Sequence, residues 1–186
     1  MDNGARSYRR FRDEGDEDGL AEIIREYRDG LIYYLIRIVD TIQVAKELDE
    51  DTFVLLGTKK PKDKGSGSFK TWLYTIGRNI AINYLRRLAR HSEISVDDCP
   101  ELASEEENPE IMYIKKERKR MVHMALKKLK PEYREVLWLI YFEDFSNKEA
   151  ASVMKKSVHN IETLVSRARK SLKSQLEAEG LENEEL

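Results

Sequence analysis

Apolar residues recur along most of this chain at the spacing of a helix, and no stretch shows the alternation of a half-buried strand. The densest run extends from Leu20 to Val39, and Gly30 interrupts it at a cost of roughly 1 kcal/mol relative to alanine. Two further helices are expected from Thr41 to Leu56 and from about Phe69 to Arg90. The pattern therefore predicts an all-α fold. The core positions expected in the first run are Ile23, Ile24, Tyr27, Leu31, Tyr34, Leu35 and Ile38.

The third predicted helix combines an apolar stripe with a basic and amide-rich surface. Basic groups beside amides and aromatic rings are typical of a surface that holds phosphates and receives unstacked bases. The alternative is a solvated surface, and a stripe of Trp and Tyr is more often core than a stacking platform. The residues expected to pack inward are Trp72, Leu73, Ile76, Ile80, Tyr84 and Leu88, and those expected on the other faces are Lys70, Arg78, Asn79, Asn83, Arg86, Arg87 and Arg90.

The run from Phe145 to Leu172 predicts two helices joined by a tight turn. Ser146 and Glu149 have the spacing of a capping box, and Ser157 is placed to cap the second helix. Such a pair suits a helix-turn-helix that places its second helix in the DNA major groove. A helical hairpin with a solvated basic face remains the alternative. The second helix carries one buried stripe made of Ile161, Val165, Ala168 and Leu172.

Helix-breaking and polar stretches divide the chain into five parts. Residues 57–68 form a loop rich in Gly, Ser, Pro and Lys, and residues 92–110 contain Pro100 and Pro109 among many acids. Helices are expected to resume near Glu110, with turns near Lys130–Pro131 and at Asp144. We therefore expect a mobile polar leader (1–19), a helical domain (20–91), an acidic flexible linker (92–110), a second small helical domain (111–176) and an acidic tail (177–186).

A net charge of −2 conceals strong segregation of charge along the chain. Residues 59–91 hold nine basic and one acidic side chain, and residues 115–173 hold 16 basic and seven acidic ones. Between these blocks, residues 92–114 hold eight acids and no Lys or Arg. Two basic blocks separated by an acidic strip favour two DNA-facing modules and a connector that avoids DNA, with ordinary solvated surface as the alternative.

Other features of the composition exclude several classes of protein. The single cysteine, Cys99, has no internal disulfide partner, which indicates a reducing cytoplasm. No apolar run approaches the roughly 18 residues of a membrane span, and the charged N-terminal stretch lacks the apolar core of a signal peptide. The three histidines, His91, His123 and His159, show no metal-ligand spacing. We find no phosphate-binding glycine loop and no catalytic constellation, so we expect no metal, no cofactor and no enzymatic activity.

From about Leu20 to Leu176 the chain resembles an RNA polymerase sigma factor of the extracytoplasmic-function group of the sigma-70 family. The matching segments are AKELDEDTF (45–53), SFKTWLYTIGRNIAINYLRR (68–87), ALKKLKPEYREVLWLIYFEDFS (125–146) and VSRARKSL (165–172). Four segments in the right order are far more specific than any one of them. The resemblance implies a sigma-2-like and a sigma-4-like domain and a role in transcription initiation. Its implied partners are core RNA polymerase, promoter DNA (single-stranded at −10, duplex at −35) and an anti-sigma factor.

In the N-terminal domain the resemblance implies two contact surfaces. Glu47 keeps a charge where the family usually has Asp, and Glu50 adds one where the family usually has Gln. The loop 59–68 matches the loop that captures a flipped base, and Asn79 matches an asparagine beside that base. The acidic linker resembles the segment that threads the polymerase channels. The implied polymerase contacts are Glu47, Leu48 and Glu50, although Leu48 also suits a core, and the implied −10 contacts are Lys64, Lys70, Arg78, Asn79, Asn83, Arg86 and Arg87.

In the C-terminal domain the resemblance makes 157–170 the recognition helix for the −35 element. Lys155 stands where a turn glycine is usual, so a lysine with positive φ is expected, and Lys156 stands where an apolar residue is common. Glu162 and Leu164 replace arginines, so a −35 sequence other than the family's usual one is implied. The candidate base contacts are His159, Asn160, Glu162, Thr163 and Ser166, and the candidate phosphate contacts are Lys148, Arg167 and Lys170, with Ser157 at the start of the helix.

Two other functions fit parts of the same sequence. A stand-alone helix-turn-helix regulator would bind a palindromic duplex as a dimer without polymerase. An adaptor that binds only protein would leave the basic faces without a DNA role.

Overall fold

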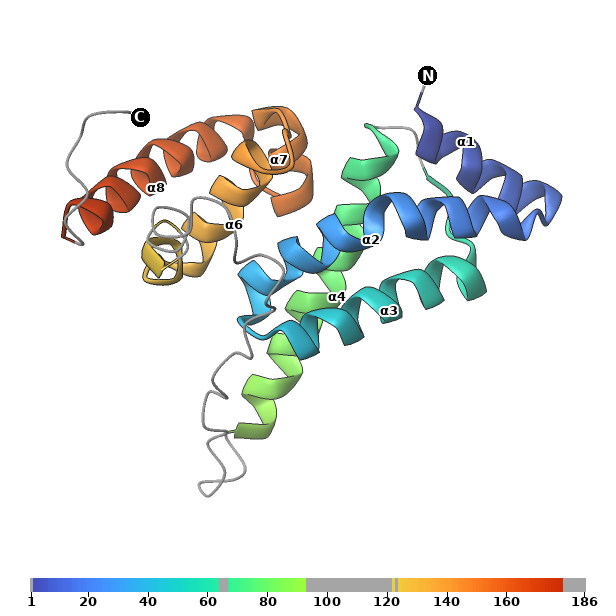
Figure 1. The fold of residues 1–186 in the computed structure, drawn as a ribbon, viewed down its shortest axis with the longest axis horizontal. Coiled ribbons are helices and arrows are strands. Elements are labelled where there is room, and N and C mark those ends of the chain that lie inside the picture. Colours follow the sequence, from blue (N-terminus) through green and yellow to red (C-terminus); the bar gives the residue numbers. More distant parts are fainter. Residues whose placement is uncertain (1, 64–66, 93–121, 123, 179–186) are drawn as a thin grey trace, which may run out of the picture.

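The computed structural model describes residues 2–63, 67–92, 122 and 124–178, and all regular structure in these residues is helical. Figure 1 shows α1 to α4 as one lobe and α6 to α8 as a second lobe that lies against it. The prediction of an all-α fold with two helical units is confirmed. The elements are α1 (Asn3–Arg9), the π-helix η1 (Arg10–Glu14), α2 (Glu17–Val39), α3 (Ile42–Lys59), α4 (Phe69–Ser92), α6 (Pro131–Tyr141), α7 (Asn147–Met154) and α8 (Val158–Ala178).

Helix α2 is the centre of the N-terminal lobe, because it packs against α1, α3 and α4 and also against α6. Its predicted apolar positions are buried at Ile23, Leu31 and Leu35. Gly30 has a packing reason: a Cβ at this position would lie 2.6 Å from the hydroxyl oxygen of Tyr74 on α4. The glycine that interrupts the sequence pattern therefore permits the close approach of two helices.

The predicted mobile leader is wrong, since residues 3–14 are helical and packed. Tyr8 is 1% exposed, and its ring centroid lies 5.6 Å from that of Phe69 and 5.1 Å from that of Trp72. Asp2 caps α1 by accepting from the amide of Ala5 and also accepts from the amide of Phe69 at the start of α4. A few aromatic side chains among many charges fix this segment to the lobe.

The helix-turn-helix of the C-terminal lobe follows its predicted capping residues. Ser146 and Glu149 form the complete capping box of α7, and the Ser157 hydroxyl accepts from the amide of Asn160 in the first turn of α8, at 3.2 Å. Lys155 ends α7 with φ 54°, the positive φ that the sequence predicted for a lysine in the turn. The Ile161 and Ala168 side chains of the predicted stripe are fully buried.

Two expectations about packing and linkage differ from the structure. Leu88 is 48% exposed, because the last turns of α4 extend past α3 (Figure 1). The two lobes touch directly, with α2 against α6 and α4 against α7. The predicted linker falls almost wholly among residues 93–121, which lie outside the described part, as does the tail beyond Ala178.

Candidate nucleic-acid and polymerase interface

Helix α8 has one buried and one exposed face, as a recognition helix requires. His159, Ser166 and Lys170 are exposed and Thr163 is half-buried, and their spacing places them opposite the stripe of Ile161 and Ala168. On the flanks of this face lie Asn160, Glu162 and Arg167, all exposed, and Ser157 is exposed at the N-cap of α8. Lys148 is exposed in the first turn of α7. Eight of the nine predicted −35 residues thus lie on α8 or at its N-cap, and the ninth lies on α7.

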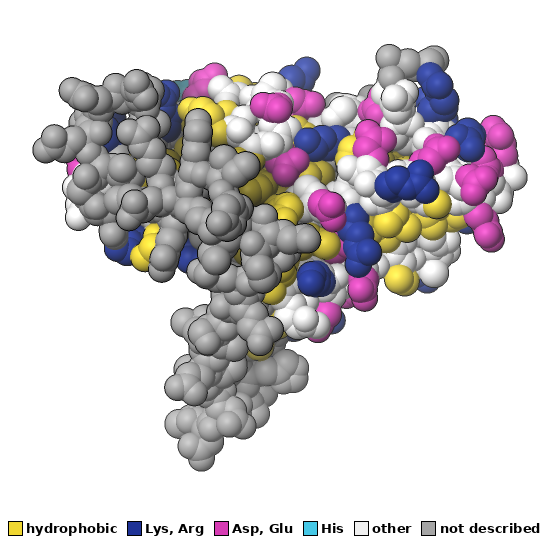
Figure 2. Space-filling model, in the orientation of Figure 1, with side chains coloured by type: hydrophobic (Ala, Val, Ile, Leu, Met, Phe, Trp, Pro, Cys, Tyr) yellow, Lys and Arg dark blue, Asp and Glu magenta, His cyan; other side chains and the backbone are white. Residues whose placement is uncertain are grey.

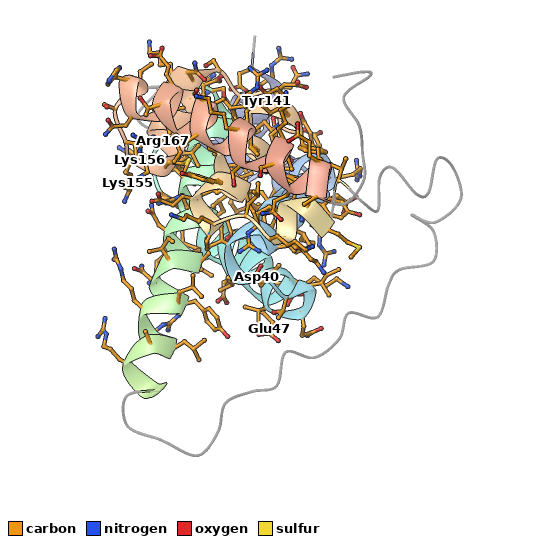
Figure 3. All side chains as sticks on the ribbon, turned by 90° about the vertical axis from the view of Figure 1, so that its left-hand side faces the viewer. Asp40, Glu47, Tyr141, Lys155, Lys156 and Arg167 are labelled. Atoms are coloured by element: carbon orange, nitrogen blue, oxygen red, sulfur yellow. The ribbon has the colours of Figure 1, made fainter. Side chains whose placement is uncertain are left out.

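Cations lie on and near α8. Lys155 and Lys156 precede the helix and Arg167 lies on it, all on the C-terminal lobe (Figure 3). The Lys156 ammonium lies 3.1 Å from a carboxylate oxygen of Glu132 on α6. On the face seen in Figure 2, by contrast, basic and acidic side chains are mixed over the described surface.

The predicted −10 residues divide between opposite faces of α4. Asn83, Arg86 and Arg87 are exposed, and Asn79 and Trp72 are half-buried near the same side of the helix. This side offers amides, an indole and cations to a strand. Lys64 lies outside the described residues.

Lys70 and Arg78 instead face the C-terminal lobe. Arg78 Nε lies 2.5 Å from Glu135 Oε1, and Lys70 Nζ lies 2.9 Å from Glu143 Oε2. Burial alone would lower the pKa of Arg78, but its hydrogen bond to Glu135 and that carboxylate's charge raise the pKa above its usual value. Both cations therefore have protein partners in this arrangement, and their contact with DNA stays a prediction.

Helix α3 exposes two of the three residues that were predicted to contact polymerase. Glu47 and Glu50 are exposed, as a contact with another protein needs. Leu48 is only 3% exposed, so its side chain belongs to the core and its prediction as a polymerase contact is wrong. The sequence pattern allowed this outcome, since Leu48 also suited an apolar stripe.

Sequence reasoning missed Asp49 on the same helix. Its side chain is 1% exposed, neither carboxylate oxygen has a hydrogen bond, and the nearest cation atom is Arg28 Nε at 3.5 Å. Burial raises the pKa of Asp49 to about 7. A carboxyl flanked by exposed acids gives no sequence signal that it points inward.

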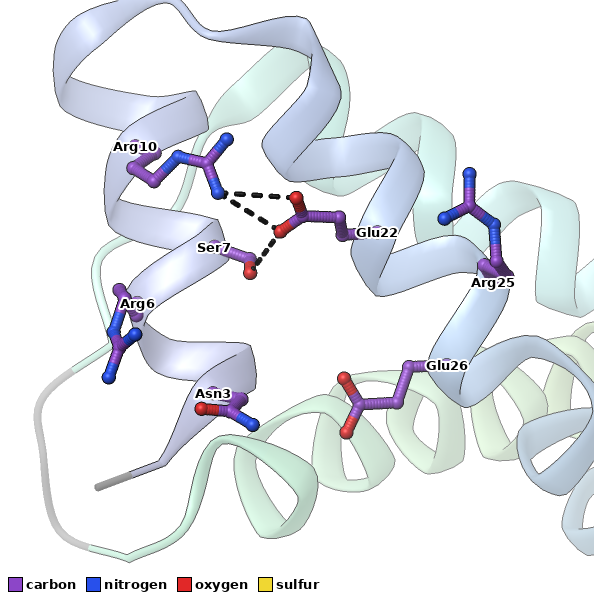
Figure 4. A pocket seen from close by; sticks show the side chains of 7 residues that line it. All are labelled: Asn3, Arg6, Ser7, Arg10, Glu22, Arg25 and Glu26. Atoms are coloured by element: carbon purple, nitrogen blue, oxygen red, sulfur yellow. Dashed lines mark hydrogen bonds and ion pairs between the residues drawn. The ribbon is translucent and has the colours of Figure 1, made fainter.

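Between α1 and α2 lies a polar pocket of about 520 Å³ (Figure 4). Glu22 accepts from the Ser7 hydroxyl at 2.6 Å and from Arg10 at 3.1 Å, and these two donors lower the pKa of Glu22. Arg10 also pairs with Asp16. These contacts join α2 to α1 and to η1, so the polar side chains at this pocket hold helices together. Its lining residues are Asn3, Arg6, Ser7, Arg10, Glu22, Arg25 and Glu26.

Two other kinds of site are absent from the part of the chain that the structure describes. No group of three or more His, Cys, Asp or Glu side chains is arranged to hold a metal ion. No helix there combines the length and the apolar character that crossing a membrane demands.

Comparison with known proteins assigns both lobes. The model of Sigma-70 region 2 matches residues 23–91, and that of Sigma-70, region 4 matches residues 119–172. The RNA polymerase sigma factor YlaC of Bacillus subtilis (strain 168) is 30% identical over 161 residues, covering 86% of this chain and 92% of YlaC. This chain belongs to the sigma-70 family of RNA polymerase sigma factors. This chain is also similar to the ECF RNA polymerase sigma factor SigW of the same bacterium, with 24% identity over 179 residues, covering 88% of this chain and 91% of SigW.

Solved structures agree with this assignment. The sigma factor RpoE of Bartonella quintana, in complex with the anti-sigma factor NepR, matches with a TM-score of 0.73 and 25% identity, covering 84% of this sigma factor and 96% of RpoE. CnrH, in complex with the cytosolic domain of CnrY, shares the fold with a TM-score of 0.63 at 24% identity, covering 95% and 96%. The predicted membership of the extracytoplasmic-function group is confirmed.

Proposed function

We propose that this alternative sigma factor divides promoter recognition between its lobes, with α3 on core RNA polymerase, α4 on single-stranded −10 DNA and α8 on duplex −35 DNA. The observation that carries the proposal is the amphipathic character of α8, which has a polar exposed face opposite a buried apolar stripe. This helix follows α7, whose N-terminus has a complete capping box. The protein acts in the cytoplasm by binding and not by chemistry of its own.

At the −35 element, α8 reads base edges in the major groove while cations hold the backbone. Glu162 is suited to accept from a cytosine amino group, and Asn160 to pair with adenine. Arg167, Lys170 and Lys148 flank these groups and bind phosphates, which fixes the helix in register. On this proposal, α8 reads a −35 sequence other than one read by arginines at the positions of Glu162 and Leu164.

At the −10 element, the exposed side of α4 holds a melted strand. Extruding a base costs a few kcal/mol of stacking and pairing, so an open promoter needs groups that capture the base. Asn79 and Asn83 offer hydrogen bonds, and Arg86 and Arg87 bind the backbone. Capture of this kind opens DNA without ATP.

Two protein partners fit the remaining surfaces. The exposed carboxylates of Glu47 and Glu50 suit a basic surface on core polymerase. An anti-sigma factor is a second partner of this chain, by analogy with the RpoE–NepR complex.

Transcription in vitro tests the proposal. Transcripts mapped across the genome after overexpression define cognate promoters, and the purified chain with core polymerase is expected to initiate from them. If the chain does not bind core polymerase in gel filtration, the proposal is wrong. The stand-alone regulator is not favoured, because it gives no role to the region-2 lobe, and it predicts a DNA-bound dimer that needs no polymerase.

A further inference from the structure

Two acidic side chains, one on α6 and one in the turn that follows it, form ion pairs with cations of α4. The Arg78 and Glu135 side chains of the first pair are 14% and 6% exposed, and Glu135 also accepts from the buried Tyr34 hydroxyl at 2.7 Å. The carboxylate of Glu143 accepts from Lys70 at 2.9 Å, and its backbone oxygen does so as well. We call the pairs Arg78–Glu135 and Lys70–Glu143 the interlobe latch.

Further donors surround the carboxylate at the edge of the latch. Glu143 also accepts from the Tyr74 hydroxyl at 2.7 Å and from the Trp138 indole N–H at 3.1 Å. Breaking one buried pair while the lobes stay together would leave an uncompensated charge, a loss of several kcal/mol. Opening of the latch therefore requires water or another anion at each of the two cations.

The length of the promoter requires this opening. The −10 and −35 elements lie about 25 base pairs apart, or roughly 85 Å of duplex at 3.4 Å per base pair. Helix α4, with 24 residues, is only ~36 Å long and touches α7, the partner of α8 in the helix-turn-helix. The closed chain is too short to bind both elements at once.

The covalent connection permits the required separation. The chain between Ser92 and Val122 spans about 30 residues, enough for up to ~100 Å when fully extended. When the lobes separate, Lys70 and Arg78 lose their carboxylates and need new anions. They lie on α4, the helix assigned to the −10 strand.

We propose that Glu135 and Glu143 are internal substitutes for promoter phosphates, which hold Lys70 and Arg78 in the closed chain and yield them to the DNA backbone when the lobes separate. This inference rests on the proposed function of α4. Because each cation exchanges one anion for another, opening on DNA leaves neither Lys70 nor Arg78 without a counter-charge, while the two carboxylates pass to water. In the free chain only the open fraction can bind single strands. The apparent affinity for single strands is therefore the affinity of the open state multiplied by the fraction of the chain that is open.

A double variant, Glu135→Gln with Glu143→Gln, tests the latch in the full chain. Glutamine keeps the size of each side chain and an acceptor for Tyr34 and Tyr74, but removes the charge. The matched control is Glu132→Gln on α6, whose side chain is 57% exposed and pairs with Lys156 of its own lobe.

Energy transfer between two dyes reports the separation of the lobes. Cysteines at exposed Val54 on α3 and Lys173 on α8 carry the dyes, in a Cys99→Ser background. The double variant is expected to lose at least half of the transfer efficiency, and the control to keep it. Unchanged transfer in a folded double variant overturns the latch.

A variant on the other side of the latch covers the case in which the double variant does not fold. Lys70→Gln is expected to open the lobes as Glu143→Gln does, and combining the two is expected to add little, since both remove the same pair. Effects that add in full mean that the pair does not hold the lobes, and they overturn the latch.

Binding of a labelled pool of mixed-sequence 15-nucleotide single-stranded DNA tests the exchange. The double variant is expected to bind the pool about five- to tenfold more tightly than the wild type, and the control no more tightly. Open lobes without tighter binding would contradict the role as phosphate substitutes. Wild-type binding to core polymerase is measured separately, so that failure there counts against the proposed function and leaves the transfer result to decide the latch.

Discussion

At the scale of single residues, the buried carboxyl of Asp49 is the strongest departure from ordinary packing. Its pKa of about 7 lies above the usual 3.8. At a pH between these two values, the folded chain therefore keeps a proton on Asp49 that the unfolded chain has lost. The folded state is therefore destabilised as pH rises from about 4 to about 7, by an upper limit of roughly 4 kcal/mol, and the penalty is complete above pH 7.

Asp49→Asn is expected to stabilise the protein at pH 8 and to change stability little at pH 4. The change in the free energy of unfolding is measured by urea denaturation across this range. Asp51→Asn, at an exposed position on the same helix, serves as the control and is expected to show no such trend. A gain of equal size at both pH values would mean that the effect does not come from ionisation.

Lys155 is a second local departure, because a residue with a Cβ occupies the left-handed region at φ 54°. This conformation costs an L-residue about 1 kcal/mol or more, and glycine adopts it freely. We expect Lys155→Gly to raise the free energy of unfolding by about 1 kcal/mol, measured by thermal or urea denaturation. The same substitution inside α8, Lys170→Gly, is expected to lower it by a similar amount. If both variants lose stability, the strain at Lys155 is absent.

At the scale of elements, helices with a regular apolar period and a capping residue were predictable from the sequence. Ser146, Glu149 and Ser157 marked two helix starts correctly, because capping is a local interaction. The helices at 3–14 were not predictable, since Tyr8 and Phe11 are isolated in a charged segment and are buried by contacts with distant helices such as α2 and α4. The direction in which Lys70 and Arg78 point depends in the same way on a distant helix.

The first helix ties down both ends of the loop assigned to base capture. The Tyr8 hydroxyl donates to the backbone oxygen of Pro61 at 2.7 Å, and Asp2 accepts from the amide of Phe69. Tyr8→Phe keeps the aromatic packing and removes one tie. It is expected to slow promoter opening several-fold while leaving core binding unchanged, as measured by permanganate reactivity of the melted strand. A promoter with a pre-formed bubble is the control, on which the variant is expected to equal the wild type; a defect there would assign Tyr8 another role.

The exposed face of α8 leads to a separate prediction about salt. Arg167→Ala removes one phosphate contact and is expected to weaken duplex binding on all sequences and to reduce the slope of log K against log salt by about 1. Binding is measured by fluorescence anisotropy over a salt series. Lys46→Ala, at an exposed position on α3 of the other lobe, is the control. An unchanged slope for Arg167→Ala would favour the protein-only adaptor.

At the scale of the whole molecule, the latch couples the unfolding of two lobes that sequence analysis predicted as separate domains. Each lobe carries one of the chain's two tryptophans: Trp72 packs on Tyr8 within the N-terminal lobe, whereas Trp138 lies under the Arg37 guanidinium of the opposite lobe, 4.2 Å from the ring centroid. Replacing one tryptophan at a time with phenylalanine makes fluorescence report on a single lobe.

In the closed chain, the two single-tryptophan variants are expected to unfold in urea with coincident midpoints, because closed lobes stabilise each other. With the two glutamines at 135 and 143 the midpoints are expected to separate, since the interface between the lobes then lacks both ion pairs of the latch. It keeps the pair between Arg134 and Asp40, but behaves more like a weak contact between domains. Coincident midpoints with and without the latch would instead place the coupling in the other contacts between the lobes, such as the ion pair of Arg134 with Asp40 and the packing of Tyr74 on Phe145 at 5.3 Å. The lobes would then separate on a promoter only by breaking those contacts, so that opening would depend on burial of the aromatic side chains as well as on charge.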